Sequence, residues 1–230
     1  MSRPVIVIRP EPGLAQTLVA ARQMGLDAQG LALFDIAPVG WDVPEVGNFD
    51  GLLIGSANAF RHGGAGLEGL RTLPVHAVGK TTAAIAHDSG FRVASTGQGG
   101  LAGLVESLSG PMRMLRLSGR ERVDLSPPPG IEVAERIVYE ARPVAMPPGF
   151  TAKLDGAVVL LHSAAAARHF SEQCELLGAP RNKIALAALG ARIADAAGSG
   201  WAEARIAASP NDAALLELAS EMCQKNGRTA

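Results

Sequence analysis

The sequence predicts an α/β protein made of two similar doubly wound parallel-sheet domains. Short apolar runs recur along the chain, and several are apolar on both faces, as strands of a covered parallel sheet are. Helix patterns lie between these runs, and the chain repeats itself in order. The predicted strands are 5–8, 31–34, 51–55, 75–79, 114–117, 136–139, 157–161, 184–189 and 204–209, and the predicted helices include 14–25, 82–90, 101–108 and 213–222.

The internal repeat consists of three pairs of segments that match in the same order. Phe34 of the first copy matches Tyr139 of the second, and Pro38 matches Pro143. Because βα units resemble one another in general, such matches are also expected without duplication; we favour two related units of about 100 residues each. The pairs are 24–39 with 129–144, 49–54 with 154–159, and 75–86 with 186–197.

Two extended segments suggest how the domains are joined. LALFDIAPV and RIVYEARPV both end in Pro-Val, and the residue before a proline favours extended backbone. We therefore expect the chain to leave one domain, build the other and return. The expected boundaries are 1–36 plus 145–230 for a discontinuous first domain, 40–136 for the second, and linker strands at about 32–39 and 137–144.

Composition excludes several function classes. The chain has 21 basic and 22 acidic residues, a formal net charge of -1, and few aromatic residues, which argues against nucleic-acid binding. Its two cysteines lack disulfide or zinc spacing, and the start of the chain does not read as a signal peptide, so we expect a cytoplasmic protein. No apolar run approaches the roughly 18 residues that a membrane span needs. The five histidines form no HExxH pattern, so we expect no metal.

AVGKTTAAIAHDSGF (77–91) resembles a phosphate-binding loop but does not complete the pattern. The loop G-x-x-x-x-G-K-[ST] requires a glycine five residues before Gly79, where the chain has Pro74. We therefore reject an ATPase. The segment still predicts a strand, a turn and a helix start, and free N–H groups at a helix start favour anions.

Further turns of this kind follow predicted strands at their carboxyl ends, where open α/β sheets bind ligands. The hydroxyls of Ser56, Thr81 and Ser163 are explained equally well as helix N-caps. Capping and ligand binding are compatible, so both interpretations stay open. The turns are 56–59, 79–82, 118–120, 163–165 and 190–192, and the candidate substrate-binding residues in them are Ser56, Asn58, Gly79, Lys80, Thr81, Gly119, Arg120, Ser163, Ala164, Gly190 and Arg192.

An ordered set of motifs over almost the whole chain resembles the uroporphyrinogen-III synthase family. The resemblance implies two α/β domains with a cleft between them, and a lyase that needs no metal or organic cofactor. The implied reaction cyclises linear hydroxymethylbilane with inversion of ring D, through an azafulvene and a spiro intermediate. The motifs are Arg-Pro at 9–10, FDGLLIGSANAF, AVGKTTAAIA, LRLSGRERVDL, RIVYEARP, LHSAAAARHF and ALGARIADAA.

The resemblance also implies roles for particular residues. Tyr139, which is the single tyrosine, matches the family's linker tyrosine and would donate a proton to the departing hydroxyl. Its other interpretation is a packing aromatic, since the repeat places Phe34 at the same position. Thr82 matches the threonine of the family's VGxxTA pattern, whereas the second copy has Ile193 there.

The second copy therefore lacks a hydroxyl at the position where the family pattern has a threonine. The alanines at 164–167 also depart from the more polar turn that is usual after Ser163. Arginines are candidate partners for substrate carboxylates, although most surface arginines are simply solvated. These arginines are Arg9, Arg120, Arg122 and Arg168.

The expected partner is the acidic linear tetrapyrrole, with no nucleic acid and no membrane. We expect a monomer, with transient contact to the enzyme that supplies hydroxymethylbilane. One alternative is a non-catalytic relative that binds an anionic ligand or a protein partner in the inter-domain cleft. Another is an unrelated two-domain binding protein of the periplasmic kind, against which the missing signal peptide argues.

Overall fold

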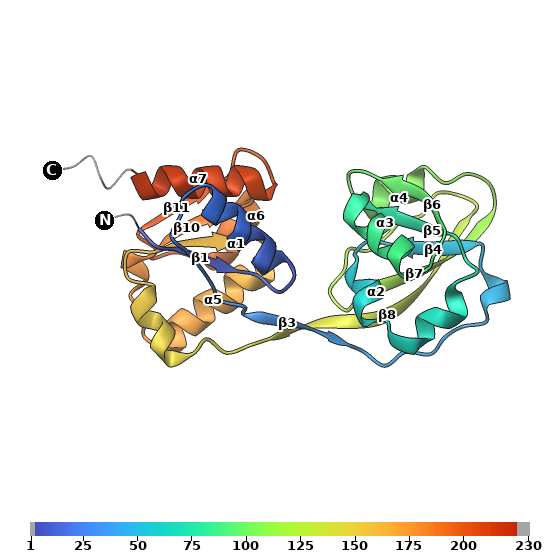
Figure 1. The fold of residues 1–230 in the computed structure, drawn as a ribbon, viewed down its shortest axis with the longest axis horizontal. Helices are drawn as coiled ribbons and strands as arrows, with labels where there is room; N and C mark the ends of the chain where they lie inside the picture. Colours follow the sequence, from blue (N-terminus) through green and yellow to red (C-terminus); the bar gives the residue numbers. More distant parts are fainter. Residues whose placement is uncertain (1–2, 225–230) are drawn as a thin grey trace. The chain divides into compact units, whose positions relative to one another are not determined.

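The computed structural model describes residues 3–224 and contains two compact α/β units (Figure 1). The first unit contains the described residues up to Asp35 and from Pro143 onward, and the second unit is Ile36–Arg142. Each unit has its own sheet and its own core. The predicted α/β class with parallel sheets in two units is confirmed.

The first unit has a five-stranded parallel sheet in the order β11-β10-β9-β1-β2. Helices α1 and α7 pack on the face that carries Val5 and Val7, while α5 and α6 pack on the face that carries Ile6 and Ile8. The strands are β1 Val5–Ile8, β2 Ala28–Gly30, β9 Val158–Leu161, β10 Ala185–Ala188 and β11 Glu203–Ile206; the helices are α1 Gly13–Gln23, α5 Ala164–Leu176, α6 Ala191–Ala197 and α7 Asp212–Gln224.

The second unit has a six-stranded sheet in the order β3-β8-β7-β4-β5-β6. Helices α2 and α3 pack on one face, and α4 packs on the other against Leu53 and Met114. The strands are β3 Phe34–Pro38, β4 Gly51–Ile54, β5 Val75–Val78, β6 Val93–Gly97, β7 Met112–Gly119 and β8 Ile131–Pro143; the helices are α2 Asn58–His62, α3 Gly79–Asp88 and α4 Leu101–Glu106. Short 3-10 turns, η1 Val46–Asn48, η2 Gly64–Leu70, η3 Pro148–Lys153 and η4 Arg181–Lys183, complete the connections of the two units.

The two sheets share one topology, circularly permuted. When the first unit is read from β9 through β11 and then β1 and β2, its strands lie in the order third, second, first, fourth, fifth. Strands β4 to β8 of the second unit lie in the same order. Each predicted repeat pair falls on equivalent elements, as 49–54 ends in β4 and 154–159 reaches β9. The shared order supports the interpretation of an internal repeat.

Strands β3 and β8 pair where the chain passes between the two units. The amide of Val39 donates to the carbonyl of Val138 at 3.0 Å, and the amide of Val144 donates to the carbonyl of Leu33 at 2.8 Å. Because the partner numbers rise on one strand as they fall on the other, the two strands run in opposite directions. Strand β8 begins at Ile131, earlier than predicted, and pairs in parallel with β7.

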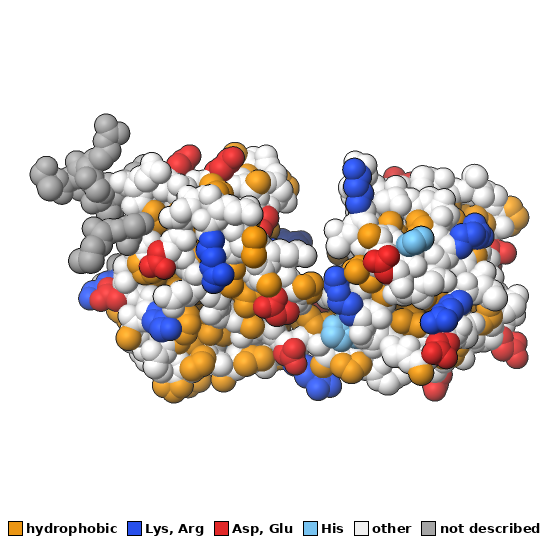
Figure 2. All heavy atoms as spheres, viewed as in Figure 1, with side chains coloured by type: hydrophobic (Ala, Val, Ile, Leu, Met, Phe, Trp, Pro, Cys, Tyr) orange, Lys and Arg blue, Asp and Glu red, His pale blue; other side chains and the backbone are white. Residues whose placement is uncertain are grey.

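Several predicted elements were wrong in detail. The run 31–34 is not one strand: β2 ends at Gly30, β3 starts at Phe34, and Leu31 and Leu33 are buried between them. Strand β6 was missed because its alternate half-buried and exposed residues lack an apolar run. Within residues 3–224, no helix has the length and apolar character of a membrane span. Figure 2 shows acidic and basic side chains interspersed on the face in view.

Candidate functional site

The second unit has a cavity at the point where its strand order reverses. The chain builds β4, β5 and β6 in one direction and then crosses to place β7 on the other side of β4. Open α/β sheets bind ligands at such a point, outside the carboxyl ends of the strands. A cavity of about 360 Å³ lies there. Its lining consists of Gly55, Ser56, Gly99, Gly100, Leu101, Ala102, Arg116, Leu117, Ser118, Gly119, Glu121, Arg122, Val123, Leu125 and Tyr139.

Four predicted site residues meet in this lining: Ser56, Gly119, Arg122 and Tyr139. Ser56 follows β4, and its Oγ accepts a hydrogen bond from the amide of Asn58 at 3.3 Å. Asn58 starts α2, and its Oδ1 accepts a hydrogen bond from Arg61 at 3.0 Å, so the Asn58 side chain is engaged within the helix. Ser56 therefore lines the cavity and hydrogen-bonds within the turn before α2, but it is not the N-cap of that helix, which is Ala57.

The Tyr139 ring lies against Gly119 on the neighbouring strand. Tyr139 and Gly119 are partners across the β7–β8 pair, at a register shift. A Cβ at position 119 would lie 2.6 Å from Cε2 of Tyr139, closer than real Cβ atoms approach. The absent side chain of Gly119 thus makes room for the ring beside the cavity. Tyr139 also lies near His62, with 6.4 Å between the ring centroids.

Two arginines of the lining share one carboxylate. Arg116 lies on β7 and is buried, and its Nη1 is 3.1 Å from Oε1 of Glu135 on β8. Arg122 donates from Nε to the other oxygen of Glu135 and from Nη1 to the Arg120 carbonyl at 2.8 Å. Burial lowers the pKa of the Arg116 guanidinium, and the charge of Glu135 opposes this shift. Sequence reasoning missed Arg116; the signal was a charge inside the apolar run MLRL.

Ser118, which opens the predicted turn 118–120, is a second polar residue of the lining. It lies two residues beyond Arg116 on β7, so both side chains point to the same face of the sheet. Ser118 is buried, and its hydroxyl forms no hydrogen bond with any described residue. A buried hydroxyl without a partner is uncommon and calls for an explanation.

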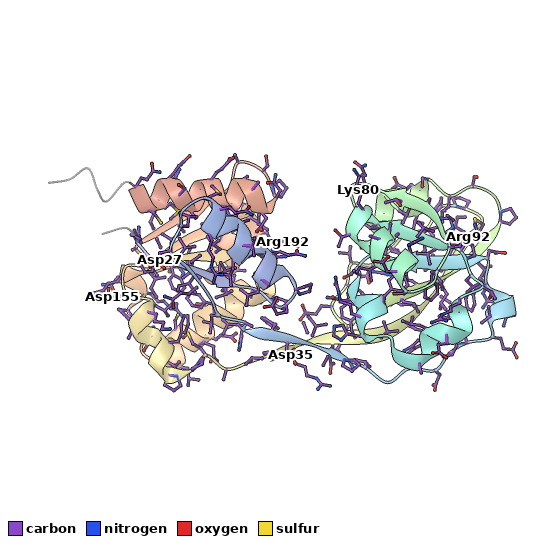
Figure 3. All side chains as sticks on the ribbon, viewed as in Figure 1. Asp27, Asp35, Lys80, Arg92, Asp155 and Arg192 are labelled. Atoms are coloured by element: carbon purple, nitrogen blue, oxygen red, sulfur yellow. The ribbon has the colours of Figure 1, made fainter. Side chains whose placement is uncertain are left out.

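Strand β5 passes directly into α3, without a loop that could wrap a phosphate chain. Gly79 starts the helix with a φ of +77°, a left-handed conformation that favours glycine. Lys80 and Thr81 are exposed (Figure 3 labels Lys80), whereas Thr82 is buried in α3. None of these four residues lines the cavity described above.

The corresponding turns of the first unit are occupied largely by helix capping and core packing. The Ser163 hydroxyl accepts a hydrogen bond from the amide of Ala166 at 3.1 Å, so Ser163 is the N-cap of α5, which starts at Ala164. Gly190 precedes α6 in extended backbone, and Arg192 is exposed (Figure 3). Ile193 packs against the core on the α5 and α6 face.

Arg9 enters a polar network at the switch point of the first unit. Its Nη1 is 3.5 Å from Oδ1 of Asp212 and donates to the Thr17 hydroxyl at 3.0 Å. Nε2 of His162 lies 2.8 Å from the same Asp212 oxygen, and the Thr17 hydroxyl donates to its other oxygen at 2.8 Å. Burial lowers the pKa of His162, although its hydrogen bond to Asp212 opposes the shift. The charge of Arg9 is thus balanced inside the unit.

The other predicted arginines lie outside the cavity. Arg120 is exposed and donates from Nε to Glu140 at 2.7 Å, and Arg168 is exposed on α5. The paired hydrogen bonds from Arg120 and Arg142 lower the pKa of Glu140. In the part of the chain that the structure describes, no three His, Cys, Asp or Glu side chains gather in a way that would hold a metal ion.

The fold and the cavity together define a two-unit protein of the doubly wound α/β class, with a cavity at the sheet switch point. A sequence profile of the family described as uroporphyrinogen-III synthase HemD matches residues 15–217. The chain belongs to this family, as the motif resemblance predicted.

One solved structure supports the fold. Uroporphyrinogen-III synthetase from Helicobacter pylori superposes with a TM-score of 0.65 at 19% identity, covering 96% of this chain and 99% of that chain. A mutant uroporphyrinogen III synthase from Thermus thermophilus covers 96% of this chain and 99% of that chain, with 16% identity and a TM-score of 0.47. No protein of curated function shows significant sequence similarity to the chain.

Proposed function

We propose that the chain is a uroporphyrinogen-III synthase, a lyase that cyclises hydroxymethylbilane with inversion of ring D in tetrapyrrole biosynthesis. The family match over residues 15–217 carries this proposal. In the proposed reaction, loss of the substrate hydroxyl gives an azafulvene, and the terminal pyrrole attacks through its substituted carbon to form a spiro intermediate. We propose a monomeric, cytoplasmic enzyme that needs no cofactor and receives its substrate through transient contact with the preceding enzyme.

The polar lining of the cavity supports an acidic ligand. Arginine side chains and hydroxyls are groups that bind carboxylates, and the lining contains Arg116, Arg122, Ser56, Ser118 and Tyr139. We assign Tyr139 the role of proton donor to the departing hydroxyl, because it is the tyrosine at the cavity wall.

We also propose that the predicted turns outside this cavity contact other acidic groups of the substrate. Lys80 and Thr81 are exposed at the start of α3, so their side chains are accessible to a ligand. Thr82 matches the family's threonine and is proposed to act through its hydroxyl, although it is buried in α3. The remaining proposed contacts are Arg9, Asn58, Gly79, Arg120, Ser163, Ala164, Gly190 and Arg192.

Product chromatography tests the proposed function. Hydroxymethylbilane closes without a catalyst to the uninverted I isomer, so the purified chain should shift the oxidised products to the III isomer. Formation of the I isomer alone, by folded protein, refutes the activity. Because positioning of the substrate should outweigh any one acid or base, the Tyr139→Phe variant should be slowed but still make the III isomer.

One observation favours a second function, that of a non-catalytic relative. Ile193 packs into the core of the first unit, where the second unit has Thr82, so one of the two repeated turns offers no hydroxyl at this position. A relative that only binds an anionic ligand would retain the cavity without accelerating ring closure. It would bind the acidic product while leaving the isomer ratio unchanged.

A further inference from the structure

Arg116 occupies a position where a charge is costly. It lies in the middle of β7, and its side chain is only 9% exposed. Leu115 and Leu117, which flank it, belong to the core on the other face of the sheet. A buried guanidinium that lacks partners would destabilise the fold, so what Arg116 binds is informative.

The protein itself satisfies Arg116 only in part. The guanidinium has five N–H donors, yet its contact within the described chain is the ion pair with Oε1 of Glu135, at 3.1 Å. Oε1 of Glu135 accepts no hydrogen bond, so the ion pair with Arg116 lacks hydrogen-bond geometry. Glu135 also binds Arg122, and two arginines therefore share one carboxylate. Asp124 adds negative charge near Arg116, and Glu121 lines the same cavity, but both are exposed and screened by water.

Ser118 adds a second free donor in the same cavity wall. The residue is 6% exposed, and its Oγ has no hydrogen-bond partner among the described residues. Arg116 and Ser118 stand on the same face of β7, and both line the cavity. A planar anion with two oxygens would accept from the guanidinium and from the hydroxyl together.

The other unit shows that the fold does not require this polar pair. In the repeat, Val158 of β9 matches Leu53 of β4. The strand partner of Val158 is Val5, and the strand partner of Leu53 is Arg116. The next position on the same face holds Val7 in the first unit and Ser118 in the second. In the first unit the fully buried Val5 and Val7 occupy these two positions. The fold alone therefore does not explain why the second unit has an arginine and a serine there.

We propose that Arg116 and Ser118 bind one carboxylate of the substrate in the cavity of the second unit. Arg116 supplies the charge and Ser118 supplies one hydrogen bond, while Glu135 competes with the ligand for the guanidinium and balances its charge when the cavity is empty. The pair sets affinity for the acidic substrate rather than the chemistry of ring closure. The identity of this ligand as hydroxymethylbilane rests on the proposed function.

Steady-state kinetics on single variants test the pair. Arg116→Gln should raise KM for hydroxymethylbilane roughly 10-fold to 100-fold, the loss expected for a charged hydrogen bond, and change kcat less. Glu135→Gln should lower KM, because it breaks the same ion pair but leaves the positive charge. Ser118→Ala should raise KM severalfold while raising the melting temperature, because it removes a buried unpaired hydroxyl.

Two further variants separate binding from folding. Arg113→Gln is the matched control: Arg113 lies on the same strand, pairs with Glu132 at 3.8 Å and lies outside the cavity, so KM should not change. Arg116→Lys keeps the charge and should recover part of the affinity if Arg116→Gln folds poorly. A purely structural role for Arg116 predicts that Arg116→Gln and Glu135→Gln lose stability together, without opposite effects on KM.

A binding measurement keeps the inference independent of turnover. The probe is uroporphyrin III, the oxidised acidic product, titrated against intrinsic tryptophan fluorescence. Wild-type binding that weakens at least 10-fold in Arg116→Gln supports the inference even if the chain makes no III isomer, in which case the proposed function alone fails. Formation of the III isomer, with equal KM and equal probe binding in wild type and Arg116→Gln, overturns the inference and leaves the proposed function standing.

Discussion

Replacing Gly119 by alanine should disturb the Tyr139 ring in a way that the structure quantifies. The new Cβ would lie 2.6 Å from Cε2 and 2.8 Å from Cζ of Tyr139. Carbon atoms prefer a separation of about 3.5–4.0 Å, so the ring must move by on the order of 1 Å. Overpacking of this kind costs about 1–3 kcal/mol. The restricted unfolded chain returns roughly 0.4–1 kcal/mol, so the central values of the two ranges leave a net loss of about 1 kcal/mol.

Urea denaturation of wild type, Gly119→Ala, Tyr139→Ala and the double variant measures this loss. The Gly119→Ala variant should be less stable than wild type, and its cost should vanish when Tyr139 is also replaced by alanine, because the clash then has no partner. Gly55→Ala is the control at the same cavity: its new Cβ would meet Leu101 at 3.7 Å, an ordinary contact, so stability should not fall.

The same variants connect the packing to the proposed activity. If Tyr139 acts at the cavity wall, displacement of its ring by Gly119→Ala should also lower kcat. Gly55→Ala does not displace the ring, so it should not lower kcat in this way. An equal free-energy cost of Gly119→Ala with and without the Tyr139 side chain would refute the contact. A stable Gly119→Ala protein with wild-type turnover would refute the importance of the ring's position.

Three further predictions concern other parts of the chain. Burial raises the pKa of Cys174 to about 12 and also raises that of Cys223, so a thiol reagent should label both only on unfolding; rapid labelling of native protein would contradict this. Burial lowers the pKa values of His76 and His162 below about 6.5. The unfolded chain then binds more protons, so the free energy of unfolding should fall as pH drops below about 6.5, with a smaller fall in His76→Gln, as urea titrations at several pH values will measure. Ser163→Ala should lower the free energy of unfolding by about 1 kcal/mol because it removes the α5 cap, and Ser163→Asp should retain most of the stabilisation from that cap. Equal stability of wild type and both variants by urea denaturation would count against the cap.

The sequence predicted the fold well where strands are buried on both faces. Strands β1, β4, β9 and β10 are continuous apolar runs with every residue buried, and periodicity finds such runs directly. Strand β6 was not predicted because it lies at a sheet edge, where half-buried and exposed residues alternate and form no apolar run. The run at 31–34 misled because Leu31 and Leu33 are apolar for core packing although neither belongs to a strand.

The sequence predicted those cavity residues that belong to turns after strands or to the repeated motifs. Ser56, Gly119 and Tyr139 stand at strand ends or in a repeated motif, and the structure brings them to one wall. Ser118 was predicted as part of the turn 118–120, whereas Arg116 was missed because its role depends on pairing across strands. Whether a charge in an apolar run meets a carboxylate on the next strand is set by register, which one strand's sequence does not contain.

The two units use one fold but leave different groups unsatisfied. At the switch point of the first unit, Arg9 meets Asp212, which also binds His162 and Thr17, so cation and carboxylate are balanced within the unit. At the switch point of the second unit, Arg116 shares Glu135 with a second arginine. Since burying an unbalanced charge is costly, the second arrangement persists more readily if an anion completes it. The two switch points thus differ in how their buried charges are balanced, and this difference supports our proposal that the cavity of the second unit receives an acidic ligand.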